Sequence, residues 1–256
     1  MGEGVLSGAA GKRGRGVEDQ PLLFRDAGLD RQGGVLAMGG VSLVEIADQS
    51  GTPAFVYNAE TIRNRYRSLD SALAGLPHRI CYAVKANSNL AVLRLLRELG
   101  AGVDIVSSGE LARVLAAGFS PDKIVFSGVG KTAGELETAV KAGIGHLNVE
   151  SREELELLGR IAESQRQQVQ VGIRVNPDVT TDTHPYISTG KSGIKFGVPT
   201  NQVVPAAQFI AAHPQLELTT LAMHLGSQIV DLDPYLQGIA HLTDLIQRTR
   251  ESGVTT

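Results

Sequence analysis

From residue 78 onward, short apolar runs rich in β-branched residues alternate with longer segments whose apolar positions recur every three to four residues. The first pattern predicts buried strands, and the second predicts amphipathic helices. Strands are predicted at residues 79–85, 103–106, 123–127, 146–150, 169–175 and 218–224. Helices are predicted at residues 90–99, 111–117, 136–142 and 155–162, with a last one at about 234–251.

The ends of the predicted helices carry matching signals. A glycine follows three of them, where a residue in the left-handed region closes a helix: Gly100, Gly118 and Gly143. Three serine or threonine residues precede a glutamate by three positions, the spacing of a capping box: Ser107/Glu110, Thr132/Glu135 and Ser151/Glu154. Strands and helices that alternate in this way predict a parallel sheet with right-handed crossovers.

Six strand-helix units fall short of the eight that a closed (β/α)₈ barrel requires. The pattern therefore leaves two architectures open, an open doubly wound sheet and a barrel that is two strands short. In both, the carboxyl ends of the strands carry the active site. Polar residues stand at the ends of all six predicted strands: Lys85, Asp104, Ser127, Glu150, Arg174 with Asn176, and His224.

The part of the chain before these units has a different character. Residues 1–20 are rich in glycine and arginine without periodicity, which predicts a disordered tail. Residues 21–77 are predicted to hold a strand at 54–57, after a Thr-Pro pair, and a helix at 59–73 that leads into the barrel. Residues 78–256 are predicted to hold the six strand-helix units, which would be an incomplete barrel in the second of the two architectures.

Composition narrows the class of protein. The 42% hydrophobic and 20% charged content of the 256 residues is that of an ordinary soluble globular protein. A net charge of −3, few aromatic residues and no tryptophan argue against a nucleic-acid partner. No apolar stretch approaches the roughly 20 residues that span a bilayer, and the start lacks the apolar core of a signal peptide. Because the single cysteine, Cys81, also fits a reducing compartment, we expect a cytoplasmic protein without a membrane partner.

Two other motifs are weaker. A GKT triplet at 130–132 is similar to the end of a phosphate-binding P-loop, but the required glycine five positions before it is Val125. Thr132 already serves as a predicted N-cap. The cluster of Asp178, Asp182 and His184 could ligate a metal, but its spacing matches no usual ligand geometry. We therefore predict a solvated loop there and no metal site.

The stretch CYAVKANSN, residues 81–89, places Lys85 at the end of an apolar strand. Strand alternation puts Cys81, Ala83 and Lys85 on one face. A lysine amine in a partly desolvated place becomes nucleophilic and can form a Schiff base with an aldehyde. Alternatively, the lysine extends its charged end into solvent from the strand end, and the two readings are about equally supported by the residues. Asp104, on the neighbouring strand, could balance the charge of such a site.

His224 ends the last predicted strand and is followed closely by Gly226 and Ser227. A strand-end histidine by itself is more often a structural residue. However, a hydroxyl beside a glycine is a natural contact for a phosphate group, because the small residue admits close approach. This turn is therefore a candidate phosphate site.

Taken together, these segments resemble the fold type III pyridoxal-phosphate-dependent decarboxylases. The matching segments occur in the family's order: YAVKAN at 82–87, DIVSSGEL at 104–111, HPYISTG at 184–190, KFG at 195–197 and HLGSQ at 224–228. The stretch THPYISTG at 183–190 favours the diaminopimelate decarboxylase branch. The resemblance extends over about residues 41–256 and implies an alanine-racemase-like TIM (β/α)₈ barrel that binds pyridoxal 5′-phosphate.

The resemblance also implies roles for individual residues. Lys85 would hold pyridoxal 5′-phosphate as a Schiff base until the amine of the substrate displaces it. His224 would stack on the pyridine ring, and Ser227, with Gly226, would contact the phosphate. Asp104 and Arg174 would line the cofactor site, and Lys195 would lie near the partner subunit of a homodimer. Glu110 also matches a family position, but its predicted role in capping a helix explains it equally well.

The implied reaction is loss of the carboxylate at the D centre of meso-2,6-diaminopimelate, a small-molecule amino acid, which gives L-lysine. Members of the family continue with a seventh strand bearing a glycine-rich phosphate loop, an acidic residue facing the pyridine nitrogen, and a β-rich domain. These features are not in the 256 residues, so we expect a barrel truncated after six units and an inefficient enzyme when the chain is alone. The alternatives are an ornithine- or arginine-type decarboxylase of the same fold and a non-catalytic cofactor-binding or decoy subunit.

Overall fold

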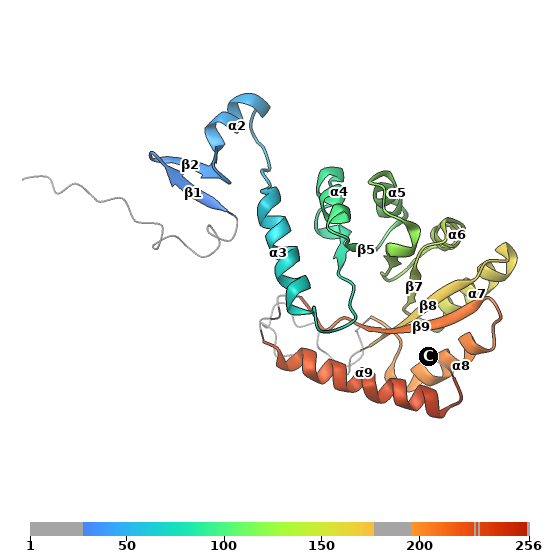
Figure 1. Ribbon diagram of the computed structural model, residues 1–256. Helices are drawn as coiled ribbons and strands as arrows, with labels where there is room; N and C mark the ends of the chain where they lie inside the picture. The colour runs from blue at the N-terminus through green and yellow to red at the C-terminus, as the bar shows by residue number, and fades with distance from the viewer. Residues whose placement is uncertain (1–27, 177–195, 228, 230, 255–256) are drawn as a thin grey trace, which may run out of the picture. The chain divides into compact units, whose positions relative to one another are not determined.

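The computed structural model describes residues 28–176, 196–227, 229 and 231–254. The chain divides into two compact units, Met1–Leu76 and Pro77–Thr256. The described part of the first unit contains an antiparallel sheet and two helices (Figure 1): β1 (Leu29–Gln32), β2 (Val35–Met38), β3 (Val41–Ser42), α2 (Leu43–Ser50) and α3 (Ala59–Ala72). The predicted disordered tail, residues 1–20, lies outside the described residues.

The strand predicted at residues 54–57 does not form. The segment belongs to neither described sheet, and the side chain of Phe55 is 92% exposed. Its β-rich composition was a sufficient reason to predict a strand, but a strand also needs a hydrogen-bonded neighbour. The helix predicted to follow is present as α3, and its first turn is capped by Asn58 Oδ1, which accepts hydrogen bonds from the backbone N–H groups of Glu60 and Thr61.

The second unit is built on a six-stranded parallel sheet whose strands neighbour one another in chain order. The strands are β4 (Cys81–Ala83), β5 (Gly102–Ile105), β6 (Ile124–Phe126), β7 (His146–Val149), β8 (Val169–Val175) and β9 (Leu216–Met223). A doubly wound sheet reverses its order at a switch point, whereas a barrel keeps the chain order throughout. The topology therefore decides between the two predicted architectures in favour of a partial barrel.

Six helices lie along the outer side of this sheet (Figure 1): α4 (Leu90–Glu98), α5 (Ser108–Ala116), α6 (Ala133–Ala142), α7 (Arg152–Gln165), α8 (Val203–Ala211) and α9 (Asp233–Glu251). The sequence analysis did not predict α8, because VVPAAQFIA is apolar at almost every position and its buried stripe does not stand out from the rest. Pro205 lies in its first turn, where proline is tolerated. None of the helices described is long and apolar enough to cross a membrane.

The two faces of the sheet differ in character. On β5, Val103 and Ile105 are fully buried in the apolar core, and the core continues through the strands into the helices. Asp104, between them, points to the opposite face because side chains alternate along a strand. Asn148 of β7 pairs with Gly172 of β8 at the same level of the sheet. The outer face thus holds the fold together, and the inner face is left for polar side chains.

The structure confirms most of the predicted signals at the helix ends. Gly100, Gly118 and Gly143 all have positive φ values, of 91°, 86° and 65°. The reciprocal capping box forms at Thr132 and Glu135. At α5 and α7 the N-cap serine accepts from the third helical N–H as predicted.

At α5 and α7 the other hydrogen bond of the predicted capping box does not form, because the glutamate side chain does not accept from the backbone N–H of the N-cap serine. Glu110 Oε2 accepts from the backbone N–H of Val106 at 2.7 Å, and Glu154 Oε2 accepts from that of Glu150 at 3.3 Å. Each glutamate therefore bonds one residue before the N-cap, where the strand has just ended. This contact ties the start of each helix to the end of the preceding strand.

Gly172 gives a test of the packing on the inner face. A Cβ atom there would lie 2.0 Å from Asn148 Oδ1, so a side chain would have to displace the amide. We expect Gly172→Ala to lower the free energy of unfolding by about 1–3 kcal/mol, the usual cost of overpacking. Gly134→Ala is the matched control, since a Cβ in this position of α6 meets nothing within 4 Å. Urea denaturation followed by circular dichroism compares the two, and equal midpoints would contradict the predicted clash.

Candidate active site

The carboxyl ends of the strands place polar side chains at one edge of the sheet, as the strand pattern predicted. Asp104 and Arg174 lie near the ends of β5 and β8, and Ser127 directly follows β6. Glu150 and His224 directly follow β7 and β9. The candidate site is therefore assembled from strands that are separated by more than a hundred residues of sequence.

Lys85 lies in η2 (Val84–Ala86), a 3₁₀ turn that directly follows β4. The strand ends at Ala83, two residues before its predicted end. Val84 is fully buried in the apolar core, whereas Lys85 is exposed. The shared face of Cys81, Ala83 and Lys85 stays a prediction. Tyr82 Oη donates to the carbonyl of Asn87 at 3.2 Å and bridges the turn. The amine is thus an accessible group at the end of the strand.

A chain of hydrogen bonds crosses three strands beneath this edge. Asn148 Nδ2 donates to Ser127 Oγ at 3.0 Å, and Ser127 Oγ donates to Asp104 Oδ1 at 2.5 Å. Burial raises the pKa of Asp104, while the Ser127 hydrogen bond and the positive charge of Lys85 act in the opposite direction. The carboxylate therefore depends on these partners to keep its charge.

An ion pair lies beside this chain. Arg174 Nη1 donates to Glu150 Oε1 at 2.7 Å, and the same oxygen accepts from the backbone N–H of Gly128 at 3.0 Å. The glutamate side chain is only 4% exposed. Its second oxygen, Oε2, is buried and has no hydrogen-bond partner among the described residues. The pair fixes the guanidinium at the inner face, where its charge acts on both Asp104 and His224.

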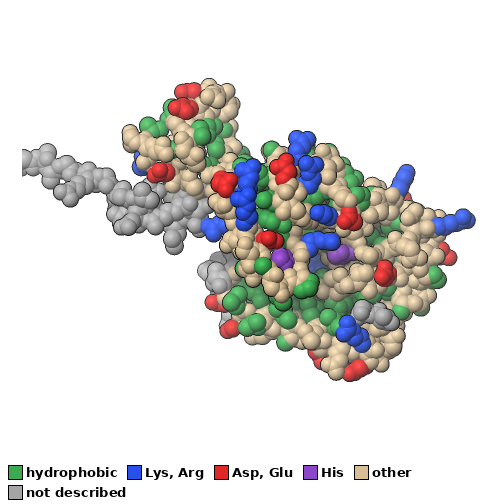
Figure 2. Space-filling view, viewed as in Figure 1, with side chains coloured by type: hydrophobic (Ala, Val, Ile, Leu, Met, Phe, Trp, Pro, Cys, Tyr) green, Lys and Arg blue, Asp and Glu red, His purple; other side chains and the backbone are tan. Residues whose placement is uncertain are grey.

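The sheet is curved, so that groups on its first and last strands act on one another electrostatically. Lys85 follows β4 and His224 follows β9, the first and last strands of the sheet. In a flat sheet they would be separated by about 24 Å, five spacings of about 4.8 Å, which is beyond the screening length of about 8 Å at physiological salt. Yet the charge of Lys85 helps to lower the pKa of His224. Figure 2 shows acidic, basic and histidine side chains interspersed near the middle of the visible face.

The turn after β9 offers the remaining groups. Gly226 has a φ of 145°, and a Cβ atom there would approach only the side chain of Ile229, at 3.6 Å. Ser227 follows with an exposed side chain. An amine, an imidazole and a hydroxyl beside a glycine suit the aldehyde, the aromatic ring and the phosphate of pyridoxal 5′-phosphate. The groups present on this edge therefore fit that cofactor.

Several predicted residues cannot be placed. Lys195, and the Asp178, Asp182 and His184 of the predicted solvated loop, lie outside the described residues. The stretch THPYISTG at 183–190, which favours the diaminopimelate branch, also lies outside the described residues.

Lys131 has a structural role that the sequence analysis missed, since it was noticed only as part of the GKT triplet at 130–132. Its side chain is 1% exposed, and Nζ donates to the carbonyls of Gly128 and Asn148, both at 2.8 Å, and to Glu154 Oε1 at 2.5 Å. The amine thus ties the ends of β6 and β7 together. No spacing signal could have revealed this role, because two of the three acceptors, Asn148 and Glu154, lie 17 and 23 residues further along the chain.

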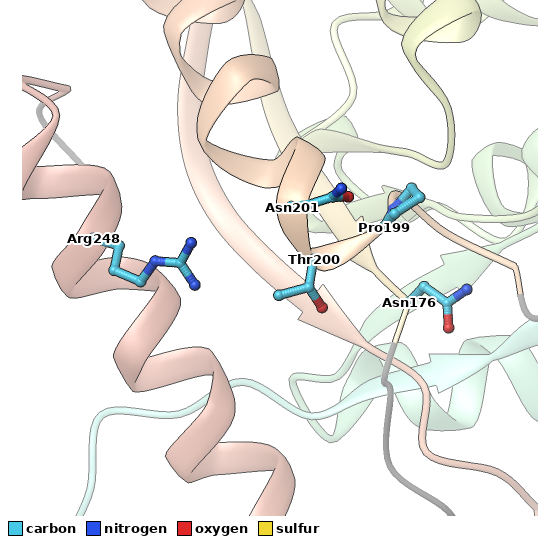
Figure 3. Close-up of a pocket in the computed structure, with 5 residues that line it drawn as sticks. All are labelled: Asn176, Pro199, Thr200, Asn201 and Arg248. Carbon is cyan, nitrogen blue, oxygen red and sulfur yellow. The ribbon is translucent and has the colours of Figure 1, made fainter. Parts of the chain in front are cut away.

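One hollow among the described residues lies away from these side chains. It has a volume of ≈ 440 Å³ and is lined by Asn176, Pro199, Thr200, Asn201 and Arg248. Arg248 extends from α9 toward the start of α8 (Figure 3). A second hollow of ≈ 340 Å³ reaches Glu150 and Gly197. Neither hollow is lined by Lys85 or His224.

Comparison with known proteins identifies the family. A family model described as the pyridoxal binding domain of pyridoxal-dependent decarboxylases matches residues 59–256. The chain belongs to the pyridoxal-dependent decarboxylases. The match covers every strand of the partial barrel and every predicted cofactor residue.

The relatives of this decarboxylase domain carry a consistent name. It is 46% identical over 231 residues to the diaminopimelate decarboxylase of Pseudomonas aeruginosa, covering 90% of this chain and 54% of the relative. It is 43% identical over 214 residues to that of Vibrio cholerae, covering 84% and 51%. The chain thus spans about half the length of the curated relatives it matches.

Solved structures with a similar fold include further diaminopimelate decarboxylases. The diaminopimelate decarboxylase of M. jannaschii in complex with L-lysine is 32% identical, with a TM-score of 0.83, and is matched over 90% of this chain and 55% of that one. The Helicobacter pylori protein, also complexed with L-lysine, is 39% identical, with a TM-score of 0.77 over 82% and 54%. A lysine/ornithine decarboxylase from Vibrio vulnificus, at 24% identity and a TM-score of 0.68, shares the fold.

The electrostatics of this decarboxylase domain predict the titration of His224. Partial loss of solvation lowers the pKa of His224 from its ordinary 6.5, and the charges of Arg174 and Lys85 lower it further. Since the folded state binds this proton less tightly than the unfolded state, His224 disfavours folding as the pH falls through about 6.5. We expect an NMR titration to give a pKa below 6.5, and Arg174→Met to raise it. An unchanged value in that variant would exclude the proposed influence of Arg174.

Proposed function

We propose that this domain binds pyridoxal 5′-phosphate through Lys85 and serves in the decarboxylation of meso-2,6-diaminopimelate to L-lysine. The observation that carries the proposal is the exposed Lys85 amine at the carboxyl edge of the sheet, where its charge acts on Asp104 and His224. The 46% identity to a diaminopimelate decarboxylase supports the choice of reaction.

Each group at the edge of the sheet has a part in the proposal. Lys85 would hold the aldehyde carbon of the cofactor at Nζ, and once released its amine could hold a proton and return it. His224, kept uncharged at neutral pH by its lowered pKa, presents a flat face to the ring. Gly226 and Ser227 receive the phosphate through backbone and hydroxyl donors. When bound, pyridoxal phosphate supplies an electron sink for the charge that departing carbon dioxide leaves behind.

Two charged residues of the inner face, Arg174 and Asp104, would supply charges of opposite sign. Arg174, held by Glu150, supplies positive charge next to the site. Asp104 supplies the negative charge that faces the Lys85 amine. A cytoplasmic homodimer is part of the proposal as well, supported by the lone Cys81 and by the family resemblance of Lys195.

An ornithine- or arginine-type decarboxylase is the second candidate, favoured by the fold shared with the Vibrio vulnificus lysine/ornithine decarboxylase. It would keep the same cofactor and the same lysine. A non-catalytic cofactor-binding or decoy subunit is the third candidate. The resemblance of residues 183–190 to the diaminopimelate branch supports the first reaction over both.

The test has two steps. The protein is incubated with pyridoxal phosphate, reduced with borohydride and digested, and the modified peptide is identified by mass spectrometry. We expect the adduct on Lys85. The absorbance of the bound cofactor is then followed during titration with meso-2,6-diaminopimelate, L-ornithine and L-arginine. A response to the first at the lowest concentration supports the proposal, a preference for ornithine or arginine supports the second candidate, and binding without any response supports the third.

A further inference from the structure

The direction of the hydrogen bonds between β5 and β7 determines where the Ser127 proton points. A serine hydroxyl has one proton to donate and can accept at its oxygen. Asn148 Nδ2 donates to Ser127 Oγ at 3.0 Å, so the hydroxyl proton is left for Asp104 Oδ1, 2.5 Å away. The chain therefore ends in a donor that is aimed at a carboxylate.

We propose that Ser127 and Asn148 are positioning residues that hold the Asp104 carboxylate charged and fixed opposite the amine of Lys85. The part of this inference that concerns the cofactor rests on the proposed function. The part that concerns Asp104 itself does not, and it can be measured on the protein without cofactor.

Asn148 is itself held in place from two sides. Its backbone carbonyl accepts from the buried Lys131 Nζ at 2.8 Å. Its side chain lies over Gly172, where a Cβ atom would come within 2.0 Å of Oδ1. The glycine thus leaves the space that the amide occupies. Because Oδ1 is buried without a hydrogen-bond partner among the described residues, the amide orientation is selected by the bond that Nδ2 makes to Ser127.

The charges around Asp104 make such support necessary. The half-buried carboxylate lies within the influence of Lys85 from η2, Arg174 from β8 and Glu110 from α5. Glu110 repels it, and burial disfavours its charged form. A neutral hydroxyl donor at 2.5 Å stabilises the charge without adding a further charge to a site that must also receive a phosphate.

The decisive comparison is between Ser127→Thr and Ser127→Val, which have nearly the same volume and differ in the hydroxyl. The pKa of Asp104 is measured in each by carboxyl ¹³C NMR on the cofactor-free protein. We expect Ser127→Val to raise it by about 0.5–1 pH unit, as for the loss of one hydrogen bond to a carboxylate, and Ser127→Thr to stay near the wild type. Asn148→Leu should shift it in the same direction by less. Thr138→Val, which removes an exposed hydroxyl from α6, is the control.

Equal Asp104 pKa values in Ser127→Thr and Ser127→Val would overturn the inference. Borohydride trapping of the same proteins reports on the proposed function separately. If the wild type forms no adduct on Lys85, the cofactor role fails while the NMR comparison still stands. If the wild type forms the adduct, we expect Ser127→Val to trap it several-fold more slowly than Ser127→Thr near pH 6, where more of its Asp104 is protonated.

Discussion

The Lys85→Ala variant is expected to lose the borohydride-stable cofactor adduct, to below about 1% of the wild-type amount, because a Schiff base requires a primary amine. Lys85→Arg should fail equally, since a guanidinium stays protonated and cannot form the bond. The exposure of Lys85 separates this effect from folding. Exposed substitutions usually change stability by no more than about 0.5 kcal/mol, so both variants should unfold at the wild-type urea concentration.

Lys141→Ala is the matched control for non-specific labelling. Lys141 is an exposed lysine in the last turn of α6, away from the strand ends. Its loss should leave the adduct on Lys85 unchanged. Quantitative peptide mapping compares the wild type with the three variants, and an adduct that persists in Lys85→Ala at another lysine would refute the assignment of the cofactor anchor.

The Lys131→Met variant is expected to lose about 3–5 kcal/mol of unfolding free energy, the usual cost of leaving a buried charge without its partner. Lys131 and Glu154 are 1% and 9% exposed, and their ion pair is 2.5 Å long. Methionine fills a similar volume but leaves Glu154 Oε1 and the carbonyls of Gly128 and Asn148 without this donor. Urea denaturation at pH 7 measures the change.

The double variant Lys131→Met/Glu154→Leu tests the cause. Because it removes both charges, it should recover most of the lost free energy, whereas a packing defect would persist or grow. The pH dependence gives a second check. Burial raises the pKa of Glu154, and the removal of Lys131 takes away the largest opposing influence. The folded pKa then exceeds the unfolded one, so the destabilisation should shrink as the pH falls toward about 4.5 and grow as it rises.

Lys131 also shows how stability and the candidate site are joined in this fold. Its amine holds the carbonyl of Asn148, whose side chain bonds Ser127. Its partner Glu154 accepts from the backbone N–H of Glu150, which pairs with Arg174. One buried ion pair therefore supports both halves of the inner face, the hydrogen-bond chain to Asp104 and the Arg174 ion pair.

Local patterns predicted most of the elements of the second unit. Strand β8 was predicted with its observed bounds, and α4 and α6 differ from prediction by one residue and three residues at one end. These successes have a common physical origin, since buried faces repeat with the period of the backbone and caps satisfy backbone groups locally. The strand predicted at 54–57 does not form, because strand pairing depends on a distant partner. Helix α8 was missed because its buried stripe does not stand out in a segment that is apolar at almost every position.

The residues of the candidate site were predictable as a list, because parallel strands expose their carboxyl ends at one edge. By itself, the sequence determined that Lys85, Asp104, Arg174 and His224 belong to that edge, and its motifs pointed to a pyridoxal-phosphate family. Only the tertiary structure decided how they meet. The curvature of the sheet lets the charge of Lys85 act on His224 from the opposite edge, and the amine is exposed in a 3₁₀ turn after the strand. The chain from Asn148 to Asp104 and the buried Lys131 depend on contacts between separate segments, for which a linear pattern carries no signal.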